Sequence, residues 1–107
     1  MRFEALELSY VVIAQLRKLL PDIRRQDAKL HKPLRDAGSS ISMNLGEGNR
    51  RRGEDRLFLW SVASGSAEEV RTGLRSALAW GYVPEGRCDE ALELIDRLQA
   101  MIWKLMH

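Results

Sequence analysis

A long stretch without proline, Glu54 to Val83, constrains the fold more than any other part of the sequence. Its apolar and small residues recur at spacings of three and four, which is the period of an α-helix. These residues are Leu59, Val62, Ala63, Ser66, Val70, Leu74, Ala77 and Leu78. At 1.5 Å per residue the helix would be roughly 45 Å long. No alternating, strand-like run of useful length appears elsewhere, so the sequence predicts an all-α chain.

The first stretch, Phe3 to Leu20, carries more apolar surface than one core needs. One stripe contains Phe3, Leu6, Tyr10 and Ile13, and a second stripe beside it contains Ala5, Leu8, Val12, Leu16 and Leu19. A single core-facing stripe covers only ~100° of a helix. We expect Pro21 to end this helix, because proline removes a backbone donor. The excess apolar face predicts contact with a second copy of the chain.

Two further helices complete the pattern. Asp22 to Lys32 is interpreted as a charged connector, and the second helix is expected to begin near Pro33 and to end at Gly46 and Gly48. Its narrow apolar stripe is Leu34, Ala37, Ile41 and Leu45. After the long helix, the last one runs from about Gly86 to Met106. Its near-regular heptad seam is Ala91, Ile95, Leu98, Ile102 and Leu105.

Four helices joined by short turns predict an antiparallel up-and-down four-helix bundle, with residues 1–107 forming a single domain. The composition agrees, because 45% of the 107 residues are hydrophobic and the net charge is only +2, which excludes intrinsic disorder. No apolar run approaches the ~20 residues that cross a membrane. Glu4 and Glu7 argue against a secretory signal, and we therefore expect a cytoplasmic protein with no membrane partner.

The small net charge hides a strong asymmetry along the chain. Residues 1–16 carry a net −1, residues 17–52 a net +6 and residues 53–107 a net −3. The basic residues of the middle segment are Arg17, Lys18, Arg24, Arg25, Lys29, Lys32, Arg35, Arg50, Arg51 and Arg52. In an up-and-down bundle they would form two basic zones at opposite ends. Such zones predict binding to the phosphates of RNA or DNA, with affinity that falls as salt rises.

Plainer interpretations of these basic residues remain open. Charge runs such as Arg50 to Arg52 are commonly solvated turns. Arg50 and Arg51 could also pair with Glu54 and Asp55 across the turn. No aromatic residues interleave with the bases, which argues against a platform for single strands.

The polar residues Asn44, Glu47, Ser66 and Glu69 lie on otherwise apolar or small-residue helix faces. They are interpreted as a structural polar network, with Asn44 and Glu47 capping or bridging a turn and Ser66 and Glu69 fixing helix register through buried hydrogen bonds. A Glu47–Glu69 pair for acid–base or metal chemistry is the weaker alternative.

No other residues point to an active site or a bound cofactor. His31 and His107 lack a partner at metal-binding spacing, and Cys88, the single cysteine, excludes an intrachain disulfide. The three tryptophans, Trp60, Trp80 and Trp103, are interpreted as core or subunit-interface anchors. We therefore predict no catalytic residues, no metal and no cofactor.

A run of residues in the second helix resembles the signature of a known family. It reads Ser40-Ile41-Ser42-Met43-Asn44-Leu45-Gly46-Glu47-Gly48-Asn49-Arg50-Arg51, followed by Ala63-Ser64-Gly65-Ser66-Ala67-Glu68-Glu69. This pattern is similar to that of the bacterial four-helix-bundle proteins encoded in intervening sequences of large-subunit ribosomal RNA genes. The resemblance covers nearly the whole chain and implies a homopentameric ring. The chain is also similar to the accessory protein of diversity-generating retroelements, a basic pentamer that binds nucleic acid and a reverse transcriptase.

The sequence thus favours a non-enzymatic, homo-oligomeric bundle whose basic rim binds structured RNA, another nucleic acid, or a nucleic-acid–protein complex. The alternative is a structural scaffold that recruits a protein partner through exposed tryptophan or leucine residues, without binding nucleic acid.

Overall fold

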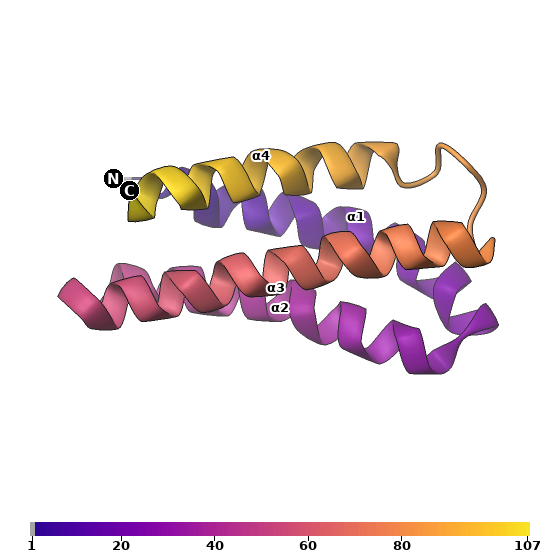
Figure 1. Cartoon of the computed structure of the whole chain (residues 1–107), viewed down its shortest axis with the longest axis horizontal. Helices are drawn as coiled ribbons and strands as arrows, with labels where there is room; N and C mark the ends of the chain where they lie inside the picture. The colour runs from indigo at the N-terminus through magenta and orange to yellow at the C-terminus, as the bar shows by residue number, and fades with distance from the viewer. Residues whose placement is uncertain (1) are drawn as a thin grey trace.

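The computed structural model describes residues 2–107 and confirms the all-α, antiparallel four-helix bundle (Figure 1). The helices are α1 (Glu4–Gln26), α2 (Ala28–Asn49), α3 (Gly53–Trp80) and α4 (Asp89–Met106). Both α1 and α3 pack against α2 and α4, in a molecule of 42 × 22 × 20 Å. The α1–α2 turn and the α3–α4 loop lie at one end, called the α1–α2 end, and the α2–α3 turn lies with both termini at the other, the α2–α3 end.

The core is formed by the apolar stripes that the periodicity predicts. The second stripe of α1 is buried, whereas Tyr10 and Val11 are 50% and 45% exposed. The α4 seam is buried from Ala91 to Ile102, and Leu105 lies outside it at 39% exposure. The α1 helix therefore does present apolar side chains beyond those that its own bundle covers.

Two sequence-based boundaries, at Pro21 and at Pro33, are wrong. The α1 helix continues through Pro21 to Gln26, and the α2 helix begins at Ala28 with Pro33 inside it. A proline inside a helix costs about 3 kcal/mol, but Ile23 continues the stripe of Leu16 and Leu19 and is fully buried. Burying an isoleucine side chain contributes about 1.5–3 kcal/mol, so packing offsets most of the cost. The supposed connector, Asp22 to Lys32, is almost entirely helical.

The chain reverses direction at Asp27, which has an extended backbone conformation (φ −156°, ψ 92°) between α1 and α2. Its carboxylate accepts hydrogen bonds from the backbone N–H groups of Lys29, at 3.0 Å, and Leu30, at 3.2 Å. Asp27 is therefore the N-cap of α2, and it satisfies donors that the first turn of a helix leaves unpaired.

Removing this cap should destabilise the bundle. We expect Asp27→Ala to lower the free energy of unfolding by about 1 kcal/mol, the usual contribution of an N-cap side chain. Asp27→Asn is the matched control, because asparagine caps helices about as well as aspartate. Urea unfolding followed by circular dichroism, at one fixed protomer concentration, measures both. Equal losses in the two variants would contradict the capping role.

The other two boundaries move by a few residues. The α3 helix ends at Trp80 because Gly81 takes a left-handed conformation (φ 77°), which favours glycine. The α4 helix begins at Asp89 rather than near Gly86. Between them, Val83 and Cys88 point inward and are buried, which ties the α3–α4 loop to the core.

Candidate nucleic-acid interface

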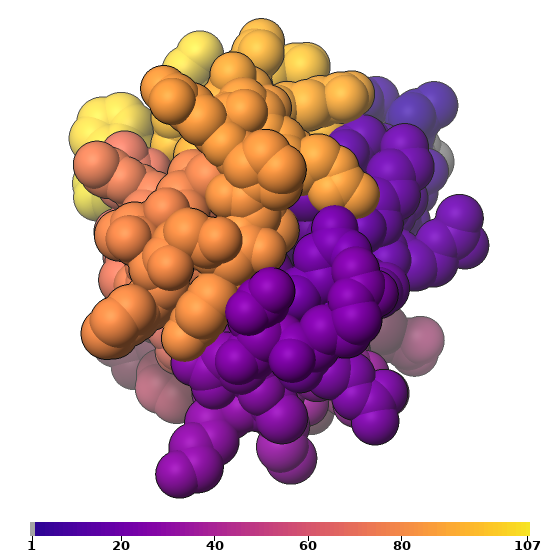
Figure 2. Space-filling view, turned by 90° about the vertical axis from the view of Figure 1, so that its right-hand side faces the viewer, coloured from indigo at the N-terminus to yellow at the C-terminus, as the bar shows by residue number. Residues whose placement is uncertain are grey.

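The ten predicted basic residues lie at both ends of the bundle, and all of them are exposed. Seven come from α1 and α2 toward the α1–α2 end, namely Arg17, Lys18, Arg24, Arg25, Lys29, Lys32 and Arg35. Arg50 to Arg52 form the turn at the opposite end. Figure 2 shows the α1–α2 end, where the residues of the α1–α2 turn lie beside the α3–α4 loop.

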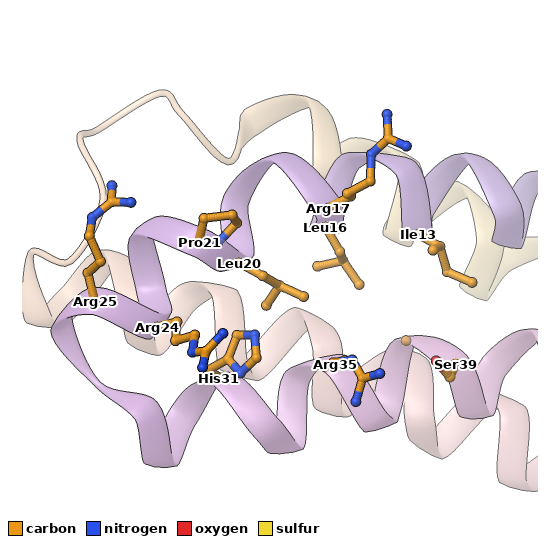
Figure 3. A pocket seen from close by; sticks show the side chains of 11 residues that line it. Ile13, Leu16, Arg17, Leu20, Pro21, Arg24, Arg25, His31, Arg35 and Ser39 are labelled. Atoms are coloured by element: carbon orange, nitrogen blue, oxygen red, sulfur yellow. The ribbon is translucent and has the colours of Figure 1, made fainter.

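A groove of about 670 Å³ runs between α1 and α2 and collects several of these cations. Ile13, Leu16, Leu20 and Pro21 supply its apolar lining, and Arg17, Arg24, Arg25, His31 and Arg35 supply its basic groups. In Figure 3, Leu16 and Leu20 point from α1 toward α2, and Arg24 lies beside His31. The extension of α1 past Pro21 makes this arrangement possible, because it carries Arg24 on a helix two turns beyond Arg17.

The arginines of this groove are only partly neutralised within the chain. Arg25 pairs with Asp22, and Lys32 pairs with Asp36 at 2.8 Å. Across residues 2–107, no carboxylate lies within 4.0 Å of the charged groups of Arg17, Arg24 or Arg35. These three guanidinium groups thus carry uncompensated positive charge around the groove, with that of Arg17 directed away from α2 (Figure 3).

Basic residues of α2 lower the pKa of the neighbouring Asp36. The hydrogen bond from Lys32 lowers the pKa of the Asp36 carboxyl group, and the positive charges of Lys32, Arg35 and His31 act in the same direction. The ionised form of Asp36 is therefore favoured by its basic neighbours.

The turn at the α2–α3 end is built differently from the sequence-based expectation. Arg51 pairs with Glu47 at 2.8 Å, within the end of α2, rather than with Glu54 or Asp55. Arg56 instead closes the turn, because its guanidinium donates to the carbonyl oxygens of Gly48 and Asn49, both at 3.0 Å. Sequence reasoning missed Arg56, since nothing in the spacing separates it from its arginine neighbours.

Ser40 is the centre of the polar contacts between α2 and α3. Its hydroxyl oxygen accepts a hydrogen bond from Asn44 Nδ2 at 3.0 Å, and Ser66 Oγ lies 2.8 Å away. Glu47 and Glu69 are exposed, and neither joins these contacts among the described residues. The two glutamates that sequence reasoning placed in this network are therefore outside it, and Ser40, which it missed, is inside.

Aromatic side chains lie closer to the basic residues than the sequence suggests. Trp80 is 73% exposed and stacks on Tyr82, with ring centroids 6.3 Å apart and planes at 13°. The Tyr82 hydroxyl donates to Asp27 Oδ2 at 3.0 Å, which places both rings at the α1–α2 end. Trp103 is also exposed, at the opposite end, whereas Trp60 is buried.

Cys88 and possible metal-holding groups are the remaining candidates for chemistry. Cys88 is fully buried, and burial raises the pKa of its thiol, which disfavours the reactive thiolate. Within residues 2–107, no group of three or more His, Cys, Asp or Glu side chains is placed to hold a metal ion. None of the helices formed by these residues has the length and apolarity needed to span a membrane.

Comparisons with known proteins identify relatives of this chain. The model of the 23S rRNA-intervening sequence protein family matches residues 3–104. A crystal structure of a protein of unknown function, from the S23 ribosomal protein family of Bacteroides thetaiotaomicron VPI-5482, superposes with a TM-score of 0.88. The two chains are 13% identical, and the match covers 95% of this chain and 97% of that one. At this identity the likeness shows a shared fold. No curated protein matches.

Proposed function

We propose a function from the premise that this chain belongs to the 23S rRNA-intervening sequence protein family, whose model matches residues 3–104. The protein is a non-enzymatic homo-oligomer of the cytoplasm that binds structured RNA, alone or within an RNA–protein complex. Its basic groove at the α1–α2 end contacts the phosphates, and the exposed arginines of the α2–α3 turn form a second contact zone.

The observation that carries this proposal is the uncompensated charge of Arg17, Arg24 and Arg35 around the α1–α2 groove. Guanidinium groups match the geometry of phosphate oxygens. The apolar floor of the groove strengthens such contacts, because charges interact more strongly where less water surrounds them. Phosphate contacts of this kind position an RNA without reading its sequence.

Self-association would bring several copies of this groove together on one particle. Tyr10 and Val11 are exposed apolar residues of α1, and they support contact between copies of the chain. A homopentamer is the assembly that the family resemblance implies, and it would repeat the groove around a ring. Several weak sites on one particle bind a long polyanion far more tightly than one site does. The similarity to the accessory protein of diversity-generating retroelements, which was inferred from the sequence, also remains a prediction.

Light scattering coupled to size-exclusion chromatography tests this function. The protein alone is expected to elute with the mass of several 12.2 kDa chains. With a structured RNA it should form a complex at low salt that dissociates as salt rises, because phosphate contacts release counterions. If the protein does not bind RNA even at low salt, the proposal is ruled out.

A second candidate function, a scaffold that recruits a protein partner, also has an observation in its favour. Leu57, Phe58, Trp103 and Leu105 are 44%, 67%, 61% and 39% exposed, and their helices bring them to the α2–α3 end. Exposed apolar residues of this kind suit a protein interface. Replacing Arg50, Arg51 and Arg52 together by alanine separates the two functions, since a scaffold would keep its affinity for the protein partner.

A further inference from the structure

Trp80 is far more exposed than tryptophan residues usually are. It is the last residue of α3, and 73% of its surface is accessible. Tryptophan side chains are highly buried on average, and the exposed surface of Trp80 contributes little to the stability of this chain. The exposed face of the ring is therefore free to contact a ligand.

The ring has an aromatic neighbour that is itself anchored by hydrogen bonds. It stacks on Tyr82 at 6.3 Å, with nearly parallel planes. The Tyr82 hydroxyl is anchored by Asp27, and the Tyr82 N–H donates to the Ala77 carbonyl at 2.9 Å. A flat ring fixed in this way can take a further planar group without losing much conformational entropy.

Basic residues of both helices flank Asp27, the residue that anchors this aromatic pair. Asp27, which anchors Tyr82, lies between the last turn of α1, with Arg24 and Arg25, and the first turn of α2, with Lys29. From the α3–α4 loop, Arg87 Nη2 donates to the Lys18 carbonyl at 3.1 Å, and Arg87 pairs with Asp22. Asp22 and Asp27 thus have partners of their own. Among the described residues, the exposed cations Arg24 and Lys29 have no carboxylate partner and are available to phosphates.

We propose that Trp80 is a stacking platform for an unpaired base of the bound RNA, with the cations of the α1–α2 end holding the flanking phosphates. Proteins recognise single-stranded RNA by stacking its splayed bases on aromatic side chains. The inference rests on the proposed function and narrows it, because it assigns RNA with an unpaired loop, rather than a continuous duplex, as the preferred ligand.

The test compares two RNA probes, a hairpin with an unpaired loop and a blunt duplex with the same stem. Fluorescence anisotropy at low salt measures the affinity of the wild type, Trp80→Ala, Trp80→Phe and Trp103→Ala. Loss of one base-stacking contact lowers affinity by about 5- to 100-fold. We expect this loss for Trp80→Ala with the hairpin, little change with the duplex, and recovery of most of the affinity in Trp80→Phe.

Two readouts distinguish stacking from other roles of Trp80. The slope of log affinity against log salt should not change in Trp80→Ala, because stacking releases no counterions. Trp103→Ala, which removes an exposed tryptophan from the opposite end, should lose less affinity for the hairpin than Trp80→Ala does. Equal hairpin binding by Trp80→Ala and the wild type would overturn the inference while leaving the proposed function intact.

Two other outcomes would also overturn it. If Trp80→Ala loses affinity for both probes and its mass by light scattering falls, Trp80 is a contact between subunits. If the wild type binds neither probe, the proposed function fails and the platform fails with it.

Discussion

Replacing Trp60 by alanine should destabilise the protein by about 3–5 kcal/mol, the range for removing a large aromatic side chain from a core. Trp60 is only 6% exposed, and its ring lies 5.7 Å from that of Phe3, between centroids. Its Nε1–H donates to the Leu45 carbonyl at 3.3 Å. One side chain of α3 therefore joins α2 to the beginning of α1, and alanine would leave a cavity and remove this hydrogen bond.

The close approach of α2 to this ring makes collapse of the cavity difficult. A Cβ atom at Gly48 would lie 2.6 Å from the Trp60 ring, closer than side-chain carbons approach one another. Gly48 is therefore required where the indole packs against α2. The guanidinium of Arg56, which closes the α2–α3 turn, lies 5.1 Å from the ring centre and would lose a cation–π contact as well.

Trp103→Ala is the matched control, since it removes the same side chain from a position that is 61% exposed. Its free energy of unfolding should stay within about 0.5 kcal/mol of the wild type. Urea unfolding followed by circular dichroism, at equal protomer concentration, compares the variants, because association also contributes to apparent stability. Similar losses in the two variants would mean that the site around Trp60 is not the packed junction described above.

The sequence predicted the helices and most of the core because burial follows periodicity. Ile95, Leu98 and Ile102 are spaced to share one face of α4, and each is fully buried. The same reasoning failed at Pro21 and Pro33, where local propensity disagrees with tertiary packing. Burial of Ile23 depends on packing against segments outside its own helix, and no local pattern contains that information. Asp27 ends one helix and caps the next through hydrogen bonds, which are visible only in three dimensions.

The basic residues of the candidate site were predicted from the sequence, but their arrangement around a groove was not. The basic residues were expected to lie partly in a connector, where they would have no fixed geometry. Continuation of α1 instead places Arg24 on the same helix as Arg17, and both residues line one groove together with Arg35 of α2. The hydrogen bond from Tyr82 to Asp27 joins residues that are far apart in the sequence. Nothing in the sequence therefore places the Trp80–Tyr82 pair at this basic end.

Replacing Arg17, Arg24 and Arg35 together by alanine should give the largest loss of RNA affinity. If each guanidinium contacts one phosphate, the slope of log affinity against log salt should fall by about 2–3. Affinity at low salt should fall by about tenfold or more, because each lost contact is a charge-assisted hydrogen bond. Anisotropy titrations of one structured RNA at several salt concentrations measure both quantities.

Groove contacts are separated from overall charge by a second triple variant, Arg71→Ala, Arg75→Ala and Arg97→Ala. It changes the net charge by the same amount, from +2 to −1, but the residues it removes lie within α3 and α4, outside the groove and outside the α2–α3 turn. Long-range attraction depends on net charge and should weaken equally in the two variants. The additional loss in the Arg17, Arg24 and Arg35 variant measures direct phosphate contact in the groove. Equal affinities and equal salt slopes would mean that RNA responds to the charge of the whole protein and that the groove is not its binding surface.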